Sequence, residues 1–163
     1  MLAKIISGGQ TGADQGGLRA ARRCGLATGG WLPRGCLTLN GPDPGLAAEF
    51  GLRETTSAQY QSRTRANVRE ADGTLRFARH FGSRGERCTR KALRQYGKPY
   101  LDIDIDRPLP VEDVRHWLRQ HHIRVLNVAG NSEQRAPGIT AFVVAYLTPV
   151  LAGPDDRALL RPK

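Results

Sequence analysis

A glycine-rich segment near the amino terminus carries the clearest chemical signal in this chain. Residues 4–7 form a short apolar run, and the sequence GGQTGADQGG follows it directly. Glycines let a backbone approach an anion closely, and the amides and dipole of a following helix attract that anion. The pattern therefore favours a phosphate cradle, although a plain strand-to-helix turn would also use glycine. The candidate binding residues in this segment are Gly8, Gly9, Gln10, Thr11, Gly12 and Asp14.

Two better-known phosphate loops do not fit this segment. A nucleotide-triphosphate loop ends in Gly-Lys followed by Ser or Thr, whereas here Ala13 and Asp14 follow Gly12. A dinucleotide fingerprint needs G-x-G-x-x-G and an acid about 20 residues further on. The order here is Gly8-Gly9-x-x-Gly12, and the next expected strand ends without a carboxylate. Ordinary ATP and NAD chemistry are therefore disfavoured.

The elements that must position this loop alternate between strand and helix. Such alternation indicates an α/β fold with a doubly wound parallel sheet in three α/β/α layers. We expect residues 1–152 to form a single ligand-binding domain and residues 153–163 to form a charged C-terminal tail. The strands are expected at residues 3–7, 27–31, 74–78, 99–103 and 124–129, and the helices at 13–24, 57–70, 86–96, 111–121 and 138–151.

Ligands of a doubly wound sheet bind where loops leave the carboxyl ends of the strands. We therefore expect the loops after the five strands to meet at one crevice. Two of these loops lead directly into a helix, so the chain offers more than one seat for an anion. The candidate residues in these loops are Trp31, Arg34, Ser83, Arg84, Gly85, Thr89, Gly130, Asn131, Ser132, Glu133 and Gly138.

Three further features stay open on sequence alone. Residues 32–56 show no clear element of their own, so this segment is either functional or disordered. Tyr60, Arg63 and Asn67 share one helix face, which suits either a solvated surface or contact with a ligand or a subunit. Arg76 stands in a strand expected to be buried on both faces, and the sequence offers no explanation for it.

The charge of the chain favours anionic partners. Lys and Arg number 25 against 15 Asp and Glu, which gives a net charge of +10 over 163 residues. We expect a small anionic ligand. The same charge suits nucleic acid, but aromatic residues make up only 6% and do not cluster with arginine as a stacking platform requires. Nucleic-acid binding is therefore the least favoured class.

Cysteine and apolar patterning bear on compartment and metal. Cys24, Cys36 and Cys88 are widely spaced without a C-x-x-C pair, and no secretory leader is apparent, so we expect a cytoplasmic protein. No Cys or His spacing matches a metal site, and we assign no metal ligand. No apolar stretch approaches the roughly 20 residues that span a bilayer, so no membrane partner is expected.

Six segments together resemble the putative molybdenum carrier family, whose members are similar to molybdenum cofactor carriers. That family lies within a Rossmann-like group with the lysine-decarboxylase-like phosphoribohydrolases and the DNA processing protein A-like proteins. The resemblance spans residues 6–139 almost continuously. The matching segments are GGQTGADQGGLRAA, GGWLPRG, ETTSAQYQSRTRANVREADGTL, GSRGERCT, KPYL and LNVAGNSEQRAPGI.

The resemblance implies a homo-oligomer, a dimer or tetramer, that binds molybdenum cofactor in a surface cleft and passes it to a molybdoenzyme acceptor. It carries three groups of residues into that cleft: Gly8, Gly9, Gln10, Thr11, Gly12 and Asp14; then Ser83, Arg84, Gly85 and Thr89; and then Gly130 to Glu133. It implies a carrier without catalytic residues. Glu86 departs from the small hydroxylated residue usual there, and its charge would weaken a phosphate seat unless it points away or caps the helix.

Two alternatives stay open beside the carrier. One is a hydrolase similar to the phosphoribohydrolases, in which Asp14 or Glu133 would serve as the acid. The local segment GSRGERCT lacks the double glycine and final glutamate of those enzymes. The other alternative is a sensor that binds a nucleotide-like ligand.

Overall fold

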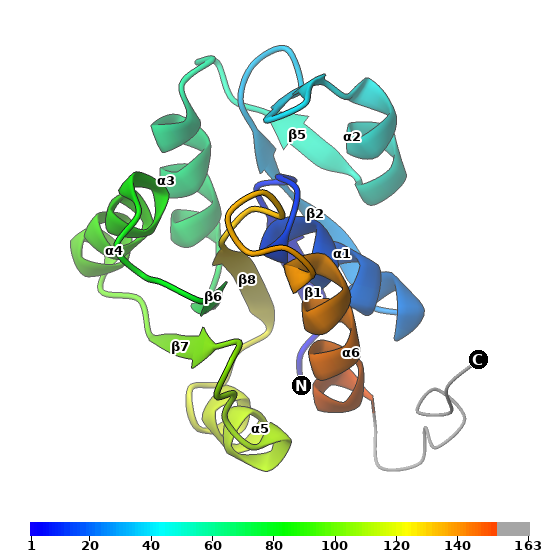
Figure 1. The fold of residues 1–163 in the computed structure, drawn as a ribbon, viewed down its shortest axis with the longest axis vertical. Coiled ribbons are helices and arrows are strands. Elements are labelled where there is room, and N and C mark those ends of the chain that lie inside the picture. Colours follow the sequence, from blue (N-terminus) through cyan, green and yellow to red (C-terminus); the bar gives the residue numbers. More distant parts are fainter. Residues whose placement is uncertain (153–163) are drawn as a thin grey trace.

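The computed structural model describes residues 1–152, and the expected tail at 153–163 lies outside them. Six parallel strands form one sheet in the order β5-β2-β1-β8-β6-β7, which confirms the α/β, Rossmann-like prediction (Figure 1). The strands are β1 (Lys4–Ser7), β2 (Ala27–Leu32), β5 (Leu52–Glu54), β6 (Gly73–Ala78), β7 (Tyr100–Asp104) and β8 (Val125–Gly130).

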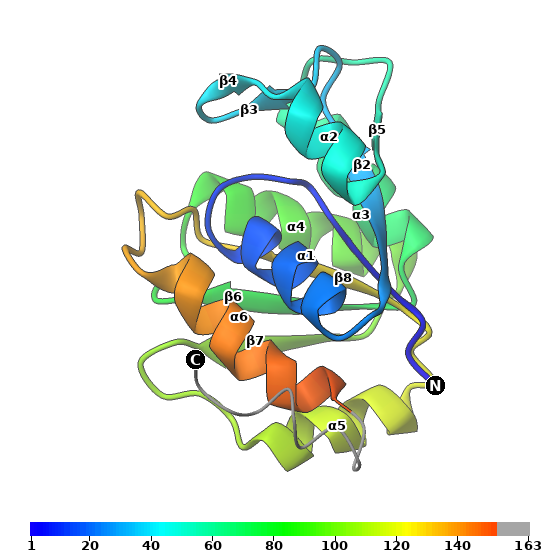
Figure 2. The same cartoon turned by 90° about the vertical axis from the view of Figure 1, so that its right-hand side faces the viewer.

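Helices cover both faces of this sheet and complete three layers (Figure 2). On one face lie α1 (Ala13–Arg23), α5 (Val111–Gln120) and α6 (Ile139–Leu151), and on the other lie α3 (Tyr60–Glu70) and α4 (Arg84–Tyr96). Within residues 1–152, no helix combines the length and apolar character needed to cross a membrane.

The larger part of the core fills the layer between the sheet and the α1, α5 and α6 helices. Ile5, Phe77, Val128 and Val143 are fully buried there. A smaller cluster around Val68 packs α3 against α4 on the opposite face. Every residue of β6 is buried, as expected for a central strand of a sheet that is covered on both faces.

The segment at residues 32–56 is more ordered than the sequence indicated. It contains a hairpin of β3 (Leu37–Thr38) and β4 (Gly41–Pro42), then α2 (Pro44–Phe50) and the edge strand β5. Asp43 caps α2 by accepting a hydrogen bond from the amide of Leu46, and Gly51 ends it with φ 65°. The expectation that this segment lacks elements of its own is therefore wrong.

The strand order decides which loops can meet. β8 lies between β1 and β6, so the loops that follow these three central strands leave the sheet side by side. The loop after β2 leaves one strand further out, beyond β1. Residues 8–12, 79–83 and 131–138 are therefore the segments that the fold brings to one place.

Candidate functional site

A cleft of about 690 Å³ opens where these three loops meet. Its volume is typical of small-molecule sites, which hold roughly 300–1,000 Å³. The α3 helix forms the opposite wall. The predicted residues that line the cleft are Gln10, Asp14, Ser83, Arg84, Gly85, Gly130, Asn131 and Ser132.

The other predicted residues do not line this cleft, and several have structural contacts instead. Gly9 donates its amide to the Ser7 hydroxyl, and the Thr89 hydroxyl bonds the Gly85 carbonyl within α4. Trp31 lies within β2, and Arg34 lies two residues after the end of that strand. The predicted residues outside the lining are Gly8, Gly9, Thr11, Gly12, Trp31, Arg34, Thr89, Glu133 and Gly138.

The carboxylate of Asp14 is hydrogen-bonded to backbone amides of the glycine-rich loop. It accepts hydrogen bonds from the Gln10 amide at 3.3 Å and from the Gly8 amide. Burial raises the pKa of Asp14, and the neighbouring Arg63 opposes that shift. The first expected anion seat therefore holds a carboxylate of the chain itself.

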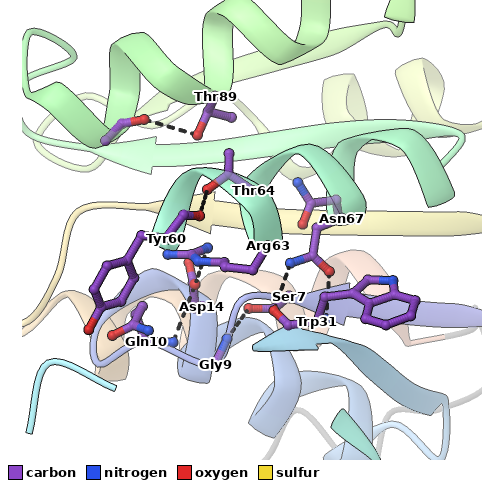
Figure 3. Close-up of polar contacts among 12 residues, drawn as sticks. Ser7, Gly9, Gln10, Asp14, Trp31, Tyr60, Arg63, Thr64, Asn67 and Thr89 are labelled. Carbon is purple, nitrogen blue, oxygen red and sulfur yellow. Dashed lines mark hydrogen bonds and ion pairs between the residues drawn. The ribbon is translucent and has the colours of Figure 1, made fainter. Parts of the chain in front are cut away.

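Arg63 lies over this loop from α3 (Figure 3). Its Nη1 is 3.4 Å from Asp14 Oδ2, and its buried Nε has no hydrogen-bond partner among the described residues. A Cβ on Gly8 would collide with this guanidinium, so glycine is required there for the approach of Arg63. Arg63 thus presents an incompletely bonded cation to the cleft.

Gln10 fastens the β3–β4 hairpin beside the cleft. Its side-chain amide donates to the Leu37 carbonyl at 3.2 Å and accepts from the Leu39 amide at 2.8 Å. The Tyr60 hydroxyl adds a bond to the Thr38 carbonyl at 3.2 Å. Leu39 and Tyr60 line the cleft and are two of the few exposed large apolar side chains among residues 1–152.

Asn131 holds the central loops together. Its Oδ1 accepts from the Arg79 amide at 3.1 Å, and its Nδ2 donates to the His80 carbonyl and to Glu86 Oε1. The side chain is 4% exposed, so its hydrogen-bonding capacity is used within the protein. Asn131 therefore positions the cleft wall.

Glu86 points away from the cleft into a buried cluster. It is 3% exposed and lies 3.4 Å from the fully buried Arg76. Arg76 also bonds Asp102, its neighbour across the β6–β7 ladder, with Nε to Oδ1 at 2.7 Å. Burial raises the pKa of Glu86 to about 7, with Arg76 opposing the shift. Arg76 thus has two carboxylate partners that the sequence did not reveal.

The first residues of α1, α3 and α4 line the cleft, and α6 begins after one of its loops; these helix ends differ in which groups bond their amides. The carboxylate of Glu133 accepts from the hydroxyl and the amide of Thr140 and from the amide of Gly138 at the start of α6, and these bonds lower the pKa of Glu133. Such a carboxylate is poorly suited to donate a proton. At α1, the Ala13 amide donates to the Asn131 carbonyl.

The N-terminus of α4 is open by comparison. The Ser83 hydroxyl accepts from the Glu86 amide at 3.1 Å, which satisfies the third amide of the helix. The amides of Arg84 and Gly85 precede it and have no carbonyl of their own helix to bond. Both residues line the cleft, so this end of α4 is a candidate anion seat to which Arg84 adds a cation. The start of α3 also lines the cleft, and its N-cap Gln59 makes no side-chain hydrogen bond to the helix.

The sequence left the role of the polar face of α3 open, and in the structure the residues of this face have different roles. Tyr60 and Arg63 line the cleft. Asn67 is buried and bonds both the amide and the carbonyl of Trp31, which joins α3 to β2 (Figure 3). Cleft residues outside the predicted set include Leu39, Gln59, Gln61, Thr64, Cys88 and Arg135.

Of the residues that sequence reasoning missed, Arg135 and Cys88 had a usable signal. Arg135 lies in a loop already expected at the crevice, and Cys88 stands among the residues predicted between Ser83 and Thr89. Leu39 lies in a hairpin that the sequence did not reveal. Within residues 1–152, no cluster of three or more His, Cys, Asp or Glu side chains is arranged to hold a metal ion.

Comparison with known proteins identifies a family and a solved structure that this chain resembles. The model of the circularly permutated YpsA SLOG family matches residues 5–151. The crystal structure of a putative molybdenum carrier protein from Syntrophus aciditrophicus SB is 36% identical, with a TM-score of 0.82. That match covers 93% of this chain and 96% of the other. No curated protein matches. The findings confirm the resemblance and indicate a ligand-binding or carrier role.

Proposed function

The chain belongs to the circularly permutated YpsA SLOG family, and on that premise we propose that its cleft binds and carries molybdenum cofactor or a related phosphorylated pterin or nucleotide. The observation that carries the proposal is one cleft with cationic and apolar parts. Arg63, Arg84 and the open end of α4 line it together with Tyr60 and Leu39.

The phosphate of the ligand is placed at the N-terminus of α4. The amides of Arg84 and Gly85 and the helix dipole favour an anion there. Arg63 faces the same cleft with its Nε unpartnered among the described residues and its side chain 15% exposed. A phosphate oxygen in the cleft can form a charge-assisted hydrogen bond with the exposed part of this guanidinium.

The ring system of the ligand is placed at the other end, beside Tyr60 and Leu39. A flat heterocycle can stack on the Tyr60 ring. The side chain of Gln59, next to Tyr60 in the chain, lines the same cleft and can read the polar edge of a pterin. This arrangement uses hydrogen bonds and stacking, which suits a carrier that must release its cargo.

A carrier needs an acceptor, and we propose a molybdoenzyme for that role and a dimeric or tetrameric assembly for the chain. A hydrolase acting on a nucleotide-like ligand is the second candidate. One observation favours it, because Asp14 lines the cleft and burial raises its pKa. Release of ribose 5-phosphate from AMP by the purified protein would support the hydrolase instead.

Anaerobic equilibrium titration with molybdenum cofactor, free pterin, AMP and GTP tests the carrier proposal. We expect the cofactor to bind at least tenfold more tightly than the other three. Arg63→Gln should weaken cofactor binding by roughly 10- to 100-fold, the effect of losing one charge-assisted hydrogen bond. The matched control is Arg19→Gln, because Arg19 is exposed on α1 and lines neither wall of the cleft.

Tyr60→Ala provides a second variant that leaves the contact between Arg63 and Asp14 in place. It should weaken binding of the cofactor and of free pterin by similar factors, since both present a ring to stack. Equal affinities of the wild-type protein for all four compounds would overturn the proposal.

A further inference from the structure

A second pocket adjoins the cleft on the outer side of α3 and α4. It is a groove of about 280 Å³. Four cationic side chains line it, Arg65 from α3 and Arg84, Arg87 and Lys91 from α4. The groove is smaller than the roughly 300–1,000 Å³ of independent small-molecule sites, so its size suits part of a ligand.

The positive charge of this groove is not neutralised within the described chain. None of its four cations forms an ion pair with a carboxylate of residues 1–152, whereas eight other Lys and Arg side chains do, among them Arg63 and Arg76. The acid on α4, Glu86, is buried against Arg76 and faces away. Four like charges gathered in one groove repel one another and attract an anion.

The groove and the cleft are continuous. Gln61, Arg84 and Cys88 line both of them. Arg84 also stands in the first turn of α4, where the phosphate of the cleft ligand is placed. An anion bound there therefore lies at the junction between the two spaces.

We infer that the ligand extends from the cleft past Arg84 into this groove and places a second anionic group against Arg65, Arg87 and Lys91. This inference rests on the proposed function and narrows its ligand class. The occupant is a diphosphate-bridged dinucleotide, with its ring system beside Tyr60, its first phosphate at α4 and its second phosphate in the groove. A monophosphate would leave the groove cations without a partner.

Binding of matched pairs of compounds tests the inference. The first pair is molybdopterin and its guanine dinucleotide form, and the second is AMP and diadenosine diphosphate. We expect the wild-type protein to bind the dinucleotide of a pair at least tenfold more tightly than the monophosphate. The double variant Arg65→Glu, Lys91→Glu should abolish this advantage and change monophosphate affinity less than about threefold at 0.15 M salt, because screening limits its long-range effect.

Arg19→Glu is the matched control, since it reverses a charge at an exposed position of α1 away from the groove. It should leave the dinucleotide advantage intact. Alkylation of Cys88, which lines both spaces, gives an independent readout. Dinucleotide should slow this reaction more than monophosphate does, with Cys24 and Cys36 as internal references.

The outcomes separate this inference from the proposed function. If molybdopterin binds and the groove variant keeps the dinucleotide advantage, the carrier proposal stands and the inference is overturned. If molybdopterin does not bind but diadenosine diphosphate binds more tightly than AMP and loses this advantage in the groove variant, the inference stands. The ligand of the cleft is then not molybdenum cofactor, and the carrier proposal is overturned. If no dinucleotide is preferred, or if the variant affects only binding of a single-stranded oligonucleotide, the inference is overturned.

Discussion

Arg76 is a fully buried cation in a strand whose every residue is buried. It persists because Asp102 lies directly across the β6–β7 ladder and Glu86 approaches from α4. The rings of Phe81 and Tyr100 lie within cation–π distance of the same guanidinium. Two carboxylates share one cation here, so the protonation of Glu86 becomes part of the stability of the fold.

The free energy of unfolding should therefore depend on pH through Glu86. Burial raises the pKa of folded Glu86 to about 7 from 4.5, so between these values the folded state holds a proton that the unfolded chain releases. The free energy of unfolding then falls as pH rises from about 4.5 to about 7. The contribution reaches at most roughly 3 kcal/mol, at about 1.4 kcal/mol per pH unit.

Urea unfolding of the wild type and of Glu86→Gln at pH 5 and pH 8 measures this contribution. The wild type should lose more stability than the variant over that interval. The raised pKa of Asp14 acts in the same direction in both proteins, and the lowered pKa of Glu133 acts only at more acidic pH. Identical losses in the two proteins would show that Glu86 does not titrate in this range.

At the residue scale, the sequence predicts which side chains gather but not what they bind. Gln10, Asp14 and Asn131 all lie at the cleft, as expected, yet each one bonds other parts of the protein. The partners of Gln10 and Asn131 come from residues 37–39 and 79–86, which only the folded topology brings near, whereas Asp14 bonds amides of its own loop and meets Arg63 from α3. Residue type fixes bonding capacity, and long-range packing decides where that capacity is used.

At the scale of elements, the junction of α1 with the β8–α6 loop depends on Gly12. Its φ of 94° and ψ of −132° suit glycine, and a Cβ there would meet the Asn131 carbonyl and the Glu133 amide. Gly25 also has a positive φ, 69°, but a Cβ there would meet nothing within 4 Å. Substitution at Gly25 therefore introduces backbone strain alone, whereas substitution at Gly12 adds a steric clash to that strain.

Gly12→Ala should therefore destabilise the protein by roughly 3 kcal/mol or more, and Gly25→Ala by only about 1 kcal/mol. Chemical denaturation of both variants provides the measurement. Gly12→Ala should also weaken ligand binding, because the loop that carries Asn131 and Ser132 would shift. Equal losses of stability would mean that the α1 junction accommodates a Cβ.

The ten longer elements were predictable because each is long enough to show its own apolar pattern, and each of their ends lies within three residues of the prediction. The helix expected at residues 57–70, for example, begins at Tyr60. The elements between residues 37 and 54 span two to seven residues, too short for a period to emerge. Asp43, Pro44 and Gly51 were nevertheless recognisable cap signals for α2.

At the scale of the whole molecule, the net charge of +10 predicts a salt-sensitive affinity for polyanions. The described surface offers little stacking, since Tyr60 and Tyr100 are its exposed large aromatic side chains. We expect single-stranded DNA to be retained on filters at 50 mM salt and to be released by 200 mM salt. Molybdenum cofactor binding should weaken less over the same range, and DNA retention at 200 mM salt would contradict this expectation.

The fold class and family were predictable from the chain as a whole, but the strand order was not. Alternating strands and helices fix a parallel sheet and right-handed connections. This alternation does not determine whether β8 pairs at an edge of the sheet or between two other strands. The placement of β8 between β1 and β6 depends on which apolar faces pack best, and it decides which loops form the cleft.

That central position of β8 also constrains the order in which the molecule can assemble during translation. Among the six described strands of the sheet, β1 is made first, yet one of its two neighbours is β8, the last of the six to leave the ribosome. Until residue 130 has emerged, β1 and β6 each expose an unsatisfied inner edge, and the nascent chain cannot close its sheet. The part of the sheet around β1 and the part around β6 cannot join until β8 is available to pair with both. The nascent chain is therefore most exposed to aggregation in the interval before β8 emerges.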